Sequence, residues 1–214
     1  MQALNHETYL ELSSGAEVLE RDGHGEKVLH LVDGSIFKLF RRKRFLSSTA
    51  FYPYAQRFSD NVEQLKNKGI PCPEMIGVYR IKGIDRDVVH YKPLPGETLR
   101  HVKNRLDNDD DLRRRLGIFI AELHAKGIYF RSLHLGNIVL TPDEKLGLID
   151  IADLKSLNKA LSQSMRLRNF HHLLRYHEDR KWLIPEQNTV FRNAYLSAAE
   201  LGNCATFRDR LSSI

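Results

Sequence analysis

The stretch that most constrains this chain runs over residues 127–153 and reads GIYFRSLHLGNIVLTPDEKLGLIDIAD. A tight SLHLG turn leads to Asn137 and the apolar run 138–140, and a TPDEK turn leads to the apolar run 146–149, which ends at Asp150. This pattern predicts a β-hairpin that holds an amide and a carboxylate side by side. Both are hard oxygen ligands of the kind that hold Mg²⁺ against nucleotide phosphates. Asn137 and Asp150 are therefore predicted to bind a metal ion and its nucleotide.

The same stretch resembles the catalytic loop and metal-binding turn of the protein-kinase superfamily, especially the short bacterial sugar and lipopolysaccharide-core kinases that read H-x-D-L-H-x-G-N and then I-D. The residues that match this pattern are Leu133, His134, Gly136, Asn137 and Asp150. Two departures accompany the match. FRS at 130–132 stands in place of H-R-D, so Ser132 replaces the carboxylate that takes the proton of the attacking hydroxyl. DIA at 150–152 stands in place of D-F-G.

The resemblance covers nearly the whole chain and is strongest to the lipopolysaccharide-core heptose kinase group (Kdo/WaaP-like, with small relatives described as toluene-tolerance proteins). It rests on the segments KLFRRKR, LHAKGIYFRSLHLGN, LIDIADL and RLRNFHHLLR. It implies an α+β, two-lobed protein-kinase-like fold: a five-stranded antiparallel sheet with one helix over residues 1–93, and a short, mainly helical lobe over 94–214. The implied activity is ATP- and Mg²⁺-dependent phosphorylation of a sugar of the lipopolysaccharide core or a related glycolipid.

Short apolar or alternating runs separated by turn residues predict the strands of the first lobe. The five predicted strands are 18–19, 28–32, 36–40, 76–81 and 88–91. Apolar residues that recur every three or four positions predict a helix over 54–68, which Gly69 ends. The same spacing predicts helices over 112–123 and 190–201 in the second lobe.

Lys38 lies in the third predicted strand, SIFKLF, and a lysine inside an apolar strand needs an anion to offset its desolvation. The resemblance gives Lys38 the role of binding nucleotide phosphates, with Gly23 and Gly25 in the first turn lying over those phosphates. The DGHG turn is also an ordinary hairpin turn. The helix of the family supplies a glutamate to the strand lysine, but Phe58 stands at that place, so pairing of Glu63 with Lys38 stays open.

The chain is basic, with a net charge of +6 and a pI near 9.3, which favours anionic partners. Four consecutive cationic residues follow the third predicted strand: Arg41, Arg42, Lys43 and Arg44. This run is either a solvated surface segment or a docking patch for lipid or saccharide phosphates at the anionic inner membrane surface. No stacking motif or recognition helix favours nucleic acid. The absence of a signal peptide and of a transmembrane run predicts a cytoplasmic protein, in peripheral contact with the inner membrane if the cations dock there.

Ser132 leaves a gap in the catalytic machinery, because a hydroxyl accepts a proton poorly at neutral pH. The first hypothesis is a kinase in which Asp153 or His134 serves the acceptor hydroxyl instead, so the catalytic candidates are Ser132, Asp153 and His134. The second is a pseudokinase that binds nucleotide or a partner and acts as a scaffold or regulator in envelope biogenesis. A nucleic-acid-binding module ranks last.

Overall fold

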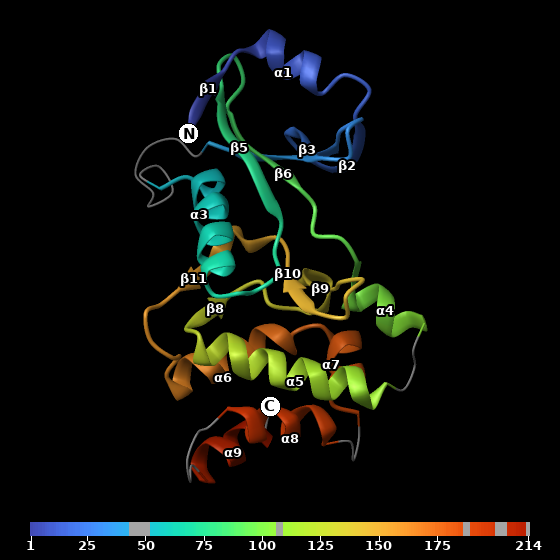
Figure 1. The fold of residues 1–214 in the computed structure, drawn as a ribbon, viewed down its shortest axis with the longest axis vertical. Coiled ribbons are helices and arrows are strands. Elements are labelled where there is room, and N and C mark those ends of the chain that lie inside the picture. Colours follow the sequence, from blue (N-terminus) through green and yellow to red (C-terminus); the bar gives the residue numbers. More distant parts are fainter. Residues whose placement is uncertain (43–51, 106–108, 186–188, 200–204, 213–214) are drawn as a thin grey trace. The chain divides into compact units, whose positions relative to one another are not determined.

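The computed structural model of the chain describes residues 1–42, 52–105, 109–185, 189–199 and 205–212. The chain divides into two compact units, Met1–Leu94 (unit 1) and Pro95–Ile214 (unit 2). Helices and strands occur in both units, so the fold is α+β as expected (Figure 1). No helix among the described residues is both long enough and apolar enough to cross a membrane.

Unit 1 is built on a six-stranded sheet of order β1-β5-β6-β4-β3-β2 (Figure 1). Its strands are β1 (Gln2–Leu4), β2 (Glu17–Asp22), β3 (Gly25–His30), β4 (Ile36–Arg41), β5 (Glu74–Ile81) and β6 (Arg86–Lys92). The five predicted strands are present as β2 to β6. The prediction of a five-stranded, wholly antiparallel sheet was wrong, because β1 adds a sixth strand that pairs in parallel with β5. Three residues are too few to show an alternating pattern.

A second correction concerns the helices of unit 1. The predicted helix is present as α3 (Tyr54–Asn67), but the described residues also form α1 (His6–Leu12), which the sequence analysis missed. The side chain of Asn5 caps α1, because its Oδ1 accepts a hydrogen bond from the Thr8 N–H at 2.6 Å. An asparagine ahead of a short apolar-periodic run was therefore the available signal.

The two helices pack on opposite faces of the sheet. The ring of Tyr9, on α1, stacks on Phe37 with 6.1 Å between centroids, whereas Tyr54, on α3, stacks on Phe40 at 6.2 Å. Positions 37 and 40 of β4 point to different faces, because side chains alternate along a strand. Each face of β4 is thus covered, and this burial of apolar surface stabilises unit 1.

Unit 2 is mainly helical. Its helices are α4 (Leu99–Arg105), α5 (Asp110–Ala125), α6 (Gln163–Leu173), α7 (His177–Leu183), α8 (Val190–Ala198) and α9 (Ala205–Ser212). The predicted helices at 112–123 and 190–201 correspond to α5 and α8. These two helices pack closely at Gly117, where an added Cβ would lie only 2.5 Å from the carbonyl oxygen of Phe191.

Two small sheets in unit 2 carry the 127–153 stretch. The first has the order β10-β9-β7 and the second pairs β11 with β8. Their strands are β7 (Glu97–Thr98), β8 (Ile128–Phe130), β9 (Ile138–Leu140), β10 (Leu146–Leu148) and β11 (Leu154–Ser156). Single 3-10 turns precede β9 and β11, at Leu135–Asn137 and Ile151–Asp153. The polar residues of interest lie in or next to these turns.

Candidate functional site

Asn137 and Asp150 lie at neighbouring strand ends of the β9–β10 hairpin. The antiparallel register pairs Ile138 with Leu148, so the residue before β9 and the residues after β10 meet at one edge. The Ile149 N–H donates to the carbonyl oxygen of Asn137 at 3.0 Å and ties the two ends together. The hairpin and its two polar ends are therefore where the sequence predicts them.

The side chain of Asn137 is oriented by the loop before it. It is 7% exposed, and its Nδ2 donates to the carbonyl oxygen of Ser132 at 2.9 Å. This bond uses the amide nitrogen and directs Oδ1 elsewhere as an acceptor. Asp150 is exposed and adopts a left-handed backbone, with φ 54° and ψ 45°. Such strained backbone at a non-glycine residue is concentrated at functional sites. One carboxylate and one amide oxygen fit Mg²⁺, which takes few protein ligands and completes its shell with water and phosphate.

Ser132 and Asp153 meet through the second small sheet. Because Phe130 of β8 pairs with Leu154 of β11, the residues that follow β8 lie beside those that precede β11. The Ser132 hydroxyl donates to Asp153 Oδ2 at 2.6 Å. Asp153 Oδ1 is buried and has no hydrogen-bond partner in the described part of the chain. A carboxylate therefore stands in direct contact with the serine that replaces the expected aspartate.

His134, the other candidate for the proton acceptor, is oriented differently. Its Nδ1 accepts a hydrogen bond from the Gly136 N–H at 3.1 Å, so the proton of the neutral ring resides on Nε2. Burial, and then the charges of Arg100 and Arg175, lower the pKa of His134 to about 4. At neutral pH the ring is uncharged, and its remaining nitrogen is a donor. Of the two candidates, Asp153 is the one with a geometry suited to accepting a proton.

Cations gather beside His134. The guanidinium carbons of Arg100 and Arg175 lie 4.8 and 4.7 Å from the ring centroid of Tyr176, and the His134 ring meets the same ring edge-on at 5.2 Å. Asp179 accepts hydrogen bonds from Arg100 at 2.6 Å and from Lys103 at 3.0 Å. One carboxylate thus faces several cations. The sequence offered the arginines of RLRNFHHLLR, which ends at Arg175, either as ligands of substrate phosphate or as a solvated helix face, and gave no local signal that Arg175 lies beside Arg100 of α4.

Lys38, in unit 1, is 7% exposed on the face of β4 that carries α3. Its Nζ lies 5.8 Å from the ring centroid of Phe40. Glu63 is exposed and lies off the buried stripe of α3. The buried polar residue on that stripe is Asn61, 8% exposed, which sequence analysis did not single out.

The turn with Gly23 and Gly25 has the form of an ordinary hairpin turn. Asp22 Oδ1 accepts a hydrogen bond from the His24 N–H at 2.8 Å, and Gly25 has a φ of 113° that favours glycine. No heavy atom lies within 4 Å of a Cβ added at either glycine, so the outer side of the turn is open.

Two members of the basic run, Arg41 and Arg42, are described. Arg42 Nη2 donates to the Ile84 carbonyl oxygen at 2.9 Å and to Asp85 at 3.2 Å, so Arg42 is tied to the β5–β6 turn. Lys43 and Arg44 lie outside the described residues.

Comparison with known proteins adds no relative to this description. No protein-family model matches the chain, and no curated protein matches it. Any assignment of function therefore depends on the residues of the site themselves.

Proposed function

We propose that this protein is a kinase-like phosphotransferase that moves the γ-phosphoryl group of ATP to a hydroxyl of a sugar in the lipopolysaccharide core or a related glycolipid. The observation that carries the proposal is the hydrogen bond between Ser132 and Asp153, in a loop that also orients Asn137. It holds a carboxylate within hydrogen-bond distance of Ser132, and by the family resemblance Ser132 stands where those kinases have an aspartate.

The side chains assigned to the nucleotide supply charge and position. Asn137 Oδ1 and the Asp150 carboxylate would hold Mg²⁺, and Lys38 is assigned to the phosphate oxygens. When bound, Mg²⁺ neutralises charge on the phosphates. Phosphoryl transfer needs mostly positioning and charge neutralisation, so three such side chains supply much of what the reaction requires.

The proton of the acceptor hydroxyl passes through Ser132 to Asp153. As the acceptor oxygen bonds to the γ-phosphorus and the bond to ADP breaks, Ser132 Oγ takes the acceptor proton and gives its own to Asp153 Oδ2. The carboxylate becomes a carboxylic acid, which releases the proton to solvent before the next turnover. The 2.6 Å distance is that of a strong hydrogen bond to a charged acceptor, along which a proton can move.

The cationic cluster beside His134 favours an acceptor that carries negative charge. Arg100 and Lys103 share the carboxylate of Asp179, whereas Arg175 is exposed and donates to the Tyr176 hydroxyl at 3.1 Å. The Nε2–H of His134 adds a neutral donor. Phosphorylated core sugars offer both a hydroxyl acceptor and the anionic groups that arginine binds well.

The decisive experiment is transfer of the γ-phosphoryl group from ATP to core oligosaccharide. Asp153→Asn is expected to lower the rate about 10²–10⁴-fold, because it removes the final proton acceptor and retains the shape of the side chain. Asp143→Asn, in the exposed 141–145 turn, is the matched control and should leave the rate unchanged. Full activity of Asp153→Asn would show that another group takes the proton.

Nucleotide binding is measured separately, by melting temperature. ATP with Mg²⁺ is expected to raise the melting temperature, and Asp150→Ala to abolish that rise, because it removes the charged metal ligand. Asp143→Ala should keep the rise. A rise that survives Asp150→Ala would remove Asp150 from the nucleotide site.

The replacement of the catalytic aspartate by Ser132 also favours a second function, a pseudokinase that binds nucleotide and acts as a scaffold or regulator of envelope biogenesis. The two functions predict different outcomes of the phosphoryl-transfer assay. If the native chain binds ATP but transfers no phosphoryl group, and Ser132→Asp creates transfer, the pseudokinase function holds. If the native chain is active and Asp153→Asn is not, the Ser132–Asp153 relay holds.

A further inference from the structure

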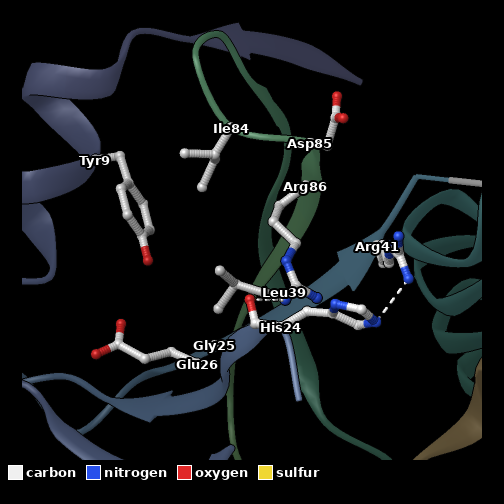
Figure 2. Close-up of a pocket in the computed structure, with 9 residues that line it drawn as sticks. All are labelled: Tyr9, His24, Gly25, Glu26, Leu39, Arg41, Ile84, Asp85 and Arg86. Atoms are coloured by element: carbon white, nitrogen blue, oxygen red, sulfur yellow. Dashed lines mark hydrogen bonds between the residues drawn. The ribbon is translucent and has the colours of Figure 1, made fainter. Parts of the chain in front are cut away.

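A pocket of about 590 Å³ opens on the face of the unit 1 sheet that carries α1 (Figure 2). Tyr9, Leu39 and Ile84 form its apolar wall, and its other end is basic, with His24, Arg41 and Arg86. Leu39 and Lys38 are neighbours in β4, so their side chains point to opposite faces. The pocket therefore lies on the opposite face of the sheet from Lys38, and Gly25 of the β2–β3 turn is the one of its lining residues that the family resemblance assigns to the nucleotide.

The basic end holds two arginines in direct register. Arg41 of β4 pairs with Arg86 of β6, which places both side chains on one face of the sheet. Like charges directly opposite each other across two strands destabilise a sheet unless an anion lies near them. Arg86 is only 7% exposed, so much of its charge has been removed from water.

The protein neutralises this pair only in part. Arg86 Nη2 donates to the His24 carbonyl oxygen at 2.8 Å and, at 3.4 Å, to Asp22. Arg41 Nη1 lies 2.7 Å from His24 Nε2, which is not a carboxylate. No carboxylate lies within ion-pair distance of Arg41 in the ranges that the structure describes.

The other acids of the pocket have cations of their own. Asp85 pairs with Arg42 at 3.2 Å, and Glu26 with Arg21 at 3.9 Å. Burial, and then the charge of Glu26, raise the pKa of Tyr9, so its hydroxyl stays protonated and can donate. Around the arginine pair the pocket thus offers hydrogen-bond donors. Within the described residues, Arg86 has Asp22 at 3.4 Å, and Arg41 has no carboxylate partner.

We propose that this pocket binds the phosphate group of a small phosphorylated molecule, whose remaining body lies against Tyr9, Leu39 and Ile84. Two guanidinium groups on one face present forked donors that match phosphate oxygens. A phosphate that accepts hydrogen bonds from both guanidinium groups would also relieve the repulsion within the pair. The His24 ring lies between the two arginines in Figure 2, so the ligand would fix the β2–β3 turn as well.

The test measures binding of phenyl phosphate to the full chain by calorimetry, because this probe carries one phosphate and one apolar ring. Arg41→Gln is expected to weaken binding about 10- to 100-fold, the loss typical of a charge-assisted contact. Arg41 is exposed, so the variant should fold, and its melting temperature checks this. Arg114→Gln, which changes an exposed arginine of α5, is the matched control and should bind phenyl phosphate as the native chain does.

A second arm distinguishes the source of the phosphate. Vesicles with and without phosphatidic acid are tested with the same variants. Binding to phosphatidic acid vesicles alone, lost in Arg41→Gln, would support the pocket and assign the phosphate to a lipid headgroup. Binding to neither probe, or binding that Arg41→Gln and Arg41→Glu leave intact, would overturn the proposal.

Discussion

Two polar clusters of unit 2 differ in how completely their atoms are paired. The first is the buried polar cluster of His124, Arg166, Asn169 and Tyr195, which joins α5, α6 and α8. Its buried side-chain nitrogens and oxygens all have partners within the described chain, whereas the Ser132–Asp153 pair leaves Oδ1 of Asp153 without one. Fully paired polar groups fix a structure, and partly paired groups are held ready for a ligand or a proton.

The hydrogen-bond directions of the buried polar cluster follow from one backbone carbonyl. Asn169 Nδ2 must donate to the Phe130 carbonyl oxygen, at 2.6 Å, so Asn169 Oδ1 accepts from His124 Nε2 at 3.2 Å. His124 Nδ1 then accepts from the Tyr195 hydroxyl at 2.9 Å, and Arg166 donates to that hydroxyl at 3.2 Å. Only a neutral His124 satisfies this arrangement.

The two clusters are connected at Phe130. Its carbonyl oxygen, held by Asn169, belongs to the residue two positions before Ser132. The buried polar cluster therefore positions the start of the loop that leads to Ser132, whose contact with Asp153 carries the proton transfer in the proposed function. The difference teaches that rigidity and reactivity are divided between adjacent groups, which the following predictions test.

The largest effect on stability is expected for Asn169→Ala. The change leaves His124 Nε2 buried without a partner, at about 1–3 kcal/mol, and removes the shorter of two hydrogen bonds to the Phe130 carbonyl oxygen, which keeps the Leu133 N–H at 3.2 Å. The free energy of unfolding, measured by urea denaturation, should fall by about 2–4 kcal/mol, the sum of one orphaned donor and one lost hydrogen bond. Asn193→Ala, on the exposed side of α8, should change it by less than about 0.5 kcal/mol. Equal losses in both variants would show that the cluster does not hold unit 2 together.

Lowering the pH should reduce the free energy of unfolding through His124 of the buried polar cluster. Burial, and then Arg166, lower the pKa of His124 to about 3, below its value in the unfolded chain. The unfolded chain therefore binds the proton first, so stability is full above about pH 6.5 and falls as pH decreases toward 3, by about 1.4 kcal/mol per pH unit. Urea denaturation between about pH 6 and 4, where this histidine is mostly protonated only in the unfolded chain, measures this slope.

A variant tests the origin of the acid slope. His124→Gln and His134→Gln should each flatten it between about pH 6 and 4, because both folded pKa values lie at or below about 4, and only His124→Gln should flatten it further between about pH 4 and 3. A slope that is the same in His124→Gln and the native chain would contradict the assignment.

The smallest effect on stability is expected for Ser132→Ala. The hydroxyl is partly exposed, so its loss should change the free energy of unfolding by about 0.5–1 kcal/mol, measured by urea denaturation. Phosphoryl transfer should fall much further, because the relay to Asp153 is broken. A large loss of stability in Ser132→Ala, together with normal phosphoryl transfer, would show that the Ser132–Asp153 hydrogen bond stabilises the fold and does not transfer the proton.

The sequence correctly predicted those helices and strands that are specified by residues within one short segment. The β9–β10 hairpin and α3 are specified by turn residues and by apolar spacing within one segment. The Ser132–Asp153 contact spans 21 positions and the Phe130–Asn169 contact spans 39. Such contacts depend on strand register and helix packing, which local periodicity does not encode. The cationic cluster at Tyr176 was missed for the same reason.

The pairing of β1 with β5 has a consequence for handling the protein. With these three residues in place, part of the β5 border already has its backbone donors and acceptors satisfied. Without β1, β5 would be an exposed edge strand with unpaired backbone N–H and C=O groups. Such an edge can pair with strands of other molecules and promote aggregation. The three-residue strand β1 thus protects the β5 edge of the sheet from intermolecular strand pairing.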